Sequence, residues 1–139
     1  MTVVFFTDRD LGNRFPEILK ANGFAVERHG DHFVPACPDE EWLPEIARRG
    51  WIAITHDARI RYKRNELAAI KRHNARLIVV VGKVPFPELA QSFVNTRVAI
   101  EAFIERTAAP FIAKVYRPSP ADLAADAGAT GRIERWFPK

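Results

Sequence analysis

The stretch ARLIVVVG, at residues 75–82, decides the fold class of this chain. Its centre is apolar on both faces, which is typical of a strand in the middle of a parallel sheet that helices cover on both sides. Two shorter apolar runs precede it, at residues 3–6 and 51–54, and polar residues follow each of them. Such short, bounded runs predict two more buried strands.

Segments with helical spacing separate these runs. Apolar positions and a closing glycine predict a helix over about 13–22, and a strand follows at 24–28. A loop over 29–38 leads to the run DEEWL, in which we expect Asp39 to be the N-cap of a helix that Gly50 ends.

The alternation continues to the end of the chain. We predict a turn at 58–62, a helix around 67–71, one long helix over 85–106, a last strand at 111–116 and a short helix over 120–127. The order βαβ-α-β-α-β-α-β predicts an α/β fold with three α/β/α layers and a parallel central sheet. Right-handed crossovers then bring the carboxyl ends of the strands to one edge. We expect a single domain over 1–139, with 117–139 as a C-terminal extension.

Composition limits the classes of function. The chain has 139 residues, 47% of them hydrophobic, and a net charge of +4 with a pI near 9.6. This balance favours a polyanionic partner such as RNA. The single cysteine, Cys37, excludes an internal disulfide and fits a reducing cytoplasm. We expect no signal peptide and no membrane-spanning segment, because no apolar run approaches the ~20 residues that a bilayer requires.

Three carboxylates stand at chain breaks. Asp8 follows the first apolar run, Asp57 follows the run at 51–54, and Asp39 begins a helix. Ligands of open α/β sheets bind outside the carboxyl ends of the strands. Carboxylates that meet there repel one another unless a cation separates them, and Mg²⁺ or Mn²⁺ suits oxygen ligands. The pattern predicts a metal-dependent enzyme that cuts phosphodiesters. Alone, Asp8 and Asp39 are more often turn or cap residues, whereas Asp57 ends an apolar strand in a polar triplet and is less easily explained that way.

Other residues are weaker candidates. Asp10 and Glu66 could be further metal ligands or ordinary acids at a helix start. His56 could be a general base, but strand alternation directs its side chain away from Asp57. The remaining histidines have no metal-ligand spacing and are expected on the surface or in loops; they are His29, His32 and His73.

Basic residues crowd the segment after Asp57. Arg59, Arg61, Lys63 and Arg64 are candidates for holding a nucleic-acid backbone. For any one of them taken singly, a solvated helix face is the better explanation. No P-loop, GxGxxG, GxSxG or HExxH motif is present, which argues against nucleotide hydrolysis, dinucleotide redox chemistry and serine hydrolase chemistry.

Three motifs resemble, in order, those of PIN-like domains, in particular the VapC-type toxin ribonucleases. They are FFTDRDLG at 5–12, DEEWL at 39–43 and ITHDARI at 54–60, and the likeness covers about residues 3–82. The resemblance implies a Mg²⁺- or Mn²⁺-dependent endoribonuclease that is the toxin of a type II toxin–antitoxin pair. An antitoxin protein is then an expected partner, and homodimers are common among such toxins. The residues that match the family's metal-binding acids are Asp8, Asp39 and Asp57.

Two other interpretations stay open. A PIN-like fold without catalytic activity could bind RNA or protein. A receiver-like phosphotransfer domain also uses clustered acids, and Asp8, Asp10 and Lys83 roughly imitate its pattern, but Asp39 and Asp57 then have no match.

Overall fold

A computed structural model describes residues 3–57, 59 and 63–138 of the chain. Its centre is a six-stranded sheet in the order β2-β1-β3-β4-β5-β6. The strands are β1 (Val4–Thr7), β2 (Ala25–Arg28), β3 (Ile52–Thr55), β4 (Arg76–Val81), β5 (Phe111–Tyr116) and β6 (Arg132–Phe137). The helices are α1 (Arg14–Ala21), α2 (Asp39–Arg48), α3 (Arg64–His73), α4 (Phe86–Asn95), α5 (Arg97–Arg106) and α6 (Pro120–Ala125), with short 3-10 turns η1 (Arg9–Leu11) and η2 (His29–Asp31).

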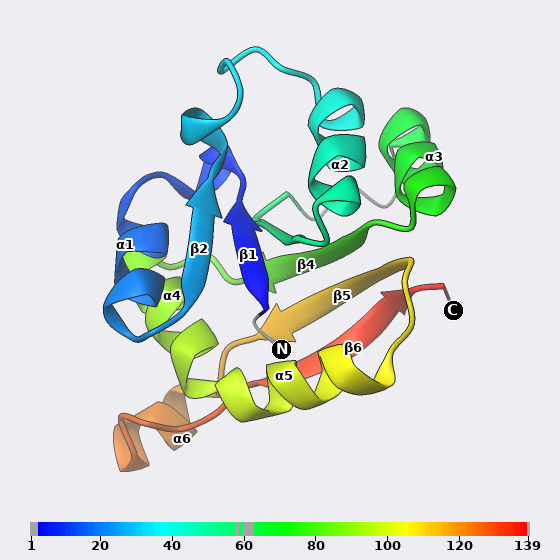
Figure 1. Ribbon diagram of the computed structural model, residues 1–139. Helices are drawn as coiled ribbons and strands as arrows, with labels where there is room; N and C mark the ends of the chain where they lie inside the picture. Colours follow the sequence, from blue (N-terminus) through cyan, green and yellow to red (C-terminus); the bar gives the residue numbers. More distant parts are fainter. Residues whose placement is uncertain (1–2, 58, 60–62, 139) are drawn as a thin grey trace.

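Helices cover both faces of the sheet, as Figure 1 shows, with α2 and α3 on one side and α1, α4 and α5 on the other. Strand β1 shows how the two layers form. Phe5 packs edge-on against Phe93 of α4 at 5.5 Å between ring centroids, and Phe6 packs against Trp42 of α2 at 5.1 Å. Adjacent side chains of a strand point to opposite faces, so one apolar pair anchors both layers. The predicted α/β/α architecture is confirmed.

Strand β4 lies in the interior of the parallel part of the sheet. It pairs in parallel with β3 and with β5, and its residues from Leu77 to Val80 are buried. The apolar character on both faces of 75–82 therefore reflects burial by both helical layers.

The expected long helix over 85–106 is wrong, because the chain forms two helices that meet at Thr96. The Thr96 hydroxyl donates to the Ser92 carbonyl at 2.7 Å and accepts from the backbone N–H of Gly131 at 3.0 Å. A Cβ at residue 131 would collide with the Tyr116 carbonyl, so glycine permits this close approach. The apolar spacing continues across the junction, and the pattern therefore does not reveal it.

The C-terminal segment adds a strand that the sequence analysis missed. Residues 111–116 do not form the last strand, because β6 follows and pairs antiparallel to β5. The Tyr116 hydroxyl donates to Glu134 at 2.9 Å, and the Lys114 ammonium lies 3.8 Å from the Trp136 ring centroid. The predicted short helix is confirmed as α6. Within the described ranges, no helix is long and apolar enough to cross a membrane.

Candidate active site

Asp8 and Asp10 form a carboxylate pair beyond the end of β1. Parallel pairing of β1 with β3 aligns Thr7 with Ile54. The Asp8 backbone N–H extends this pairing by donating to the Ile54 carbonyl at 2.9 Å. The turn η1 then brings Asp10 back, so that the Thr55 hydroxyl lies 3.0 Å from one carboxylate oxygen of each acid.

The Thr55 hydroxyl carries one hydrogen and can donate to only one of the two acids at a time. The second contact becomes a hydrogen bond when the other acid keeps its proton and donates to the hydroxyl oxygen. The raised affinity of the pair for protons agrees with this arrangement. Burial, and then the charges of Asp10 and Asp39, raise the pKa of Asp8 to about 7, and loss of surrounding water also raises the pKa of Asp10.

Asp57, beyond the end of β3, has the opposite surroundings. The Lys63 ammonium donates to its carboxylate at 2.6 Å, and the Arg59 backbone N–H donates at 3.0 Å. Although partial burial acts to raise the pKa of Asp57, the hydrogen bond from Lys63 and those from Arg59 hold it below its usual value. The same pairing raises the pKa of Lys63. Asp57 is therefore a neutralised carboxylate.

Asp39 and Glu66 lie in the first turns of α2 and α3. The expected N-cap role of Asp39 is wrong: Pro38 occupies the cap, and the Asp39 carboxylate accepts from the Trp42 indole N–H at 3.1 Å. The side chain reaches along its own helix because residue 39 already has helical geometry. The Asp39 charge acts on Asp8, and the charges of Asp39 and Glu66 both act on Lys63.

The predicted basic residues lie beside this group. Lys63 and Arg59 contact Asp57, and Arg64 is exposed at the start of α3. Arg61 lies outside the described residues, as does most of the predicted turn at 58–62.

The histidines divide between the two faces of the sheet. A ring nitrogen of His56 lies 2.8 Å from the Gly82 carbonyl, and its ring meets Phe86 edge-on, so it faces away from Asp57. His29 is expected on the surface or in a loop; it lies in the turn η2, within the predicted loop, but it is buried, with 2% of its surface exposed. Its ring packs among aromatic side chains of Phe6, Phe33 and Trp42. An isolated histidine after a short strand carries no signal for this burial.

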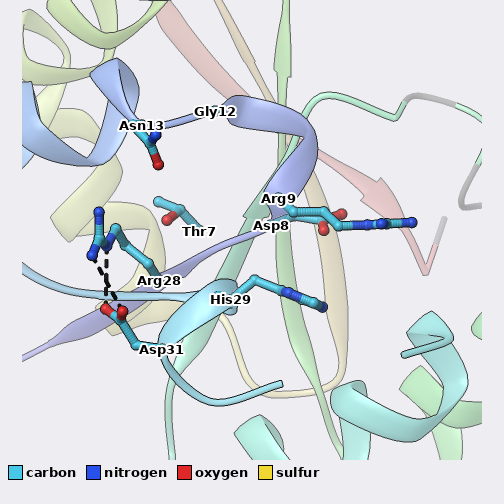
Figure 2. A pocket seen from close by; sticks show the side chains of 9 residues that line it. Thr7, Asp8, Arg9, Gly12, Asn13, Arg28, His29 and Asp31 are labelled. Carbon is cyan, nitrogen blue, oxygen red and sulfur yellow. Dashed lines mark hydrogen bonds and ion pairs between the residues drawn. The ribbon is translucent and has the colours of Figure 1, made fainter. Parts of the chain in front are cut away.

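A cavity of about 290 Å³ adjoins Asp8. Figure 2 shows the side chains that line it. Asp8, Arg9 and His29 lie on one side of it. Arg28 and Asp31 lie on the other side, joined by hydrogen bonds of 3.1 and 3.2 Å. The sequence analysis did not identify this cavity, because its walls come from two segments that meet only through the pairing of β1 with β2.

The donor chemistry of the paired acids fits a hard divalent cation. Two carboxylates share one buried hydroxyl, whereas the Lys63 ammonium is bound to Asp57. Within 3–57, 59 and 63–138, however, no three His, Cys, Asp or Glu side chains are already arranged to hold a metal ion. The structure thus brings Asp8 and Asp10 together, and it places Asp39 and Asp57 within electrostatic range rather than in one ligand set.

Comparison with known proteins gives one match. A family model described as a PIN like domain matches residues 3–82, which is more than half of the chain. PIN-like domains are commonly nucleases, and such nucleases generally use divalent metals. The matched region contains β1 to β4 and all five candidate acids, whereas β5, β6 and α4 to α6 follow it. No curated protein and no solved structure matches the chain.

Proposed function

The chain belongs to the PIN-like domain family, and from this premise we propose that it is a metal-dependent endoribonuclease. The observation that carries the proposal is the Asp8–Asp10 pair. Both carboxylates contact the buried Thr55 hydroxyl at 3.0 Å, at the edge of a parallel sheet where ligands bind. Membership of this family also makes the receiver-like alternative unnecessary.

The acids supply a site for Mg²⁺ or Mn²⁺. Asp8 and Asp10 would hold the ion, and Asp39, Asp57 and Glu66 are its further candidate ligands. A bound divalent cation supplies charge neutralisation at the phosphate and activation of the attacking water. Thr55 orients the pair through its hydroxyl, and burial of Asp8 keeps bulk water away from the ion's ligands.

The basic residues next to Asp57 would hold the RNA backbone. Arg59 and Arg64 are exposed, and Arg59 and Lys63 both contact Asp57. Arg61 is a further candidate on sequence grounds. Attraction to phosphate would position the strand with its scissile bond near the carboxylates and stabilise charge in the transition state.

The biological setting that we propose is a toxin–antitoxin pair in the cytoplasm. A cognate antitoxin would cover the acidic edge of the sheet and could place an arginine among the carboxylates. A homodimer is the expected assembly. A small reading frame next to the gene, encoding a protein that suppresses RNA cleavage, would support this setting.

One observation favours a second candidate, a PIN-like module that binds RNA or protein without cutting it. The Lys63 ammonium lies 2.6 Å from Asp57 and thus satisfies an acid that a nuclease would offer to its metal. In this candidate the internal cation replaces the divalent ion, and metal-dependent cleavage is absent.

Incubation of the purified protein with a structured RNA pool tests the proposal. Parallel reactions contain Mg²⁺, Mn²⁺ or EDTA, and compare the wild type with Asp8→Asn, Asp57→Asn and a control, Asp122→Asn, on the distant helix α6. We expect cleavage that requires metal, disappears in Asp8→Asn and persists in the control. Absence of cleavage by folded protein free of antitoxin would favour the binding module.

A further inference from the structure

We propose that the cavity beside Asp8 binds one unstacked base of the RNA strand and thereby sets the base preference of cleavage. This inference rests on the proposed ribonuclease function. The cavity measures about 290 Å³, near the small end of the range for ligand sites, which suits a single base rather than a dinucleotide. Proteins that read single-stranded RNA commonly splay out a base and bind its edge with side chains.

The wall opposite Asp8 carries unused hydrogen-bonding capacity. Arg28 donates to Asp31 from Nε and Nη2, which leaves Nη1 and further hydrogens of its five. The Asp31 carboxylate likewise keeps acceptor sites beyond these two bonds. Asn13, whose amide group is both donor and acceptor, lines the same cavity, and no side-chain cap bond engages it at the start of α1. A base edge presents the same mixture of donors and acceptors.

His29 adds a buried polar group without a partner. Its ring is 2% exposed, and among the described residues neither ring nitrogen makes a hydrogen bond. A buried polar atom left unpaired costs free energy, so native structures seldom keep one without a reason. The ring nitrogens are themselves covered, so the His29 ring, which borders the cavity, must turn to reach a partner on a ligand there.

The charges of the cavity favour a base over a phosphate group. Asp8 and Asp31 line it together with Arg9 and Arg28, so the formal charges of its lining balance, and Arg28 is already paired with Asp31. Burial, followed by the charge of Arg9, lowers the pKa of His29, which favours the neutral ring. A lining without net charge suits a neutral ligand with a polar edge better than an anion.

The position of the cavity links base recognition to cleavage. Asp8 belongs both to the cavity wall and to the carboxylate pair. A base held in the cavity therefore places its own backbone next to the acids. The selected base would flank the bond that is cut, and the geometry would restrict cleavage to sites with that base.

A binding measurement without metal tests the cavity apart from catalysis. In EDTA, adenosine, guanosine, cytidine and uridine are titrated into the protein while NMR follows the ring nitrogens of His29, with exposed His73 as internal control. We expect one nucleoside to shift His29 saturably and to leave His73 unchanged. His29→Phe, which keeps an aromatic ring in the aromatic surroundings, should weaken that binding at least tenfold. A shift caused by inorganic phosphate, or by no nucleoside, would overturn the proposal.

A cleavage measurement then tests specificity. Cut sites in the RNA pool are mapped for the wild type, Arg28→Ala, His29→Phe and the control His73→Ala. We expect one base to dominate at a fixed position next to the cut in the wild type and control, and this preference to fall at least fivefold in the two cavity variants. Unchanged preferences would overturn the inference. Nucleoside binding without cleavage would instead reject the ribonuclease function while retaining the base site.

Discussion

Asp8 and Asp57 follow neighbouring parallel strands, yet they have opposite electrostatic surroundings. Asp8 is buried beside Asp10 and near Asp39, and its pKa rises to about 7. Asp57 is bound by Lys63 and Arg59, and its pKa falls. The comparison shows that one sheet edge holds an acid that lacks a cation and an acid that already has one. The first is the point where a divalent ion relieves the most repulsion.

Loss of Asp8 should have the largest effect. Asp8→Asn keeps the shape of the side chain but removes the charge that would hold the metal, and we expect RNA cleavage to fall about 1,000-fold or more. Rates with saturating Mn²⁺ measure this loss. Asp57→Asn should lose less, since Asp57 is already neutralised, and an equal loss in both variants would remove the distinction between the two acids.

The pH dependence of stability should separate the same two acids. The folded-state pKa of Asp8 exceeds its ordinary value of 3.8, so its stabilising contribution is complete below that value and is lost as pH rises through about 7. Asp57 has the opposite sign: its contribution is present above its ordinary pKa and is lost on acidification. Without metal, we expect the ionisation of Asp8 to lower the free energy of unfolding by roughly 2–3 kcal/mol as the pH rises from 5 to 8.

Urea unfolding in EDTA at these two pH values measures that change. The difference between pH 5 and 8 should shrink in Asp8→Asn and remain in Asp122→Asn. A wild type that is equally stable at both values would contradict the raised pKa of Asp8. Addition of Mn²⁺ at pH 8 should restore stability to the wild type more than to Asp8→Asn.

Thr55→Val should show how far the pair depends on one hydroxyl. The valine keeps the side-chain volume but leaves both carboxylates without this partner, and we expect a loss of about 1–3 kcal/mol in the free energy of unfolding. Thr55→Ser, which restores the hydroxyl, should recover most of the loss and most of the metal affinity. If serine behaves like valine, packing rather than hydrogen bonding explains the effect.

Lys63→Met should have the smallest effect, because the Lys63–Asp57 pair is partly exposed and such pairs contribute about 1 kcal/mol or less. Removal of the ammonium frees Asp57, so we expect calorimetry to show Mn²⁺ binding about threefold to fivefold more tightly. In free energy this factor is about 1 kcal/mol or less. Lys71→Met, in the helix α3 that Lys63 precedes, is the matched control. Weaker Mn²⁺ binding in Lys63→Met would mean that Lys63 supports the site rather than competes with its metal.

Much of this architecture could be predicted from local patterns. The apolar run at 75–82 indicated a central parallel strand, and β4 occupies that place. The motifs around Asp8, Asp39 and Asp57 indicated the PIN-like family, which the match over 3–82 confirms. These predictions are right because burial on both faces of a strand, and the change from strand to helix, require particular residue types at particular spacings.

Other features could not be predicted from local sequence patterns. The junction at Thr96 depends on a hydrogen bond from Gly131, which lies 35 residues away in the chain. The edge strand β6 carries charged residues that resemble a polar tail. The roles of the five candidate acids stay predictions, but the structure shows that Asp10, a minor candidate by sequence, is the closest companion of Asp8.

The sequence by itself determined the layered α/β fold, the family and the edge of the sheet where the acids gather, because these follow from hydrophobic period and strand polarity. Only the tertiary structure decided which acid has a cation as its partner, which acid lacks one, and that His29 is buried beside a polar cavity. Those properties depend on distances between side chains from different strands, and on the water that packing removes. Neither these distances nor this loss of water can be inferred from the residues next to each acid in the sequence.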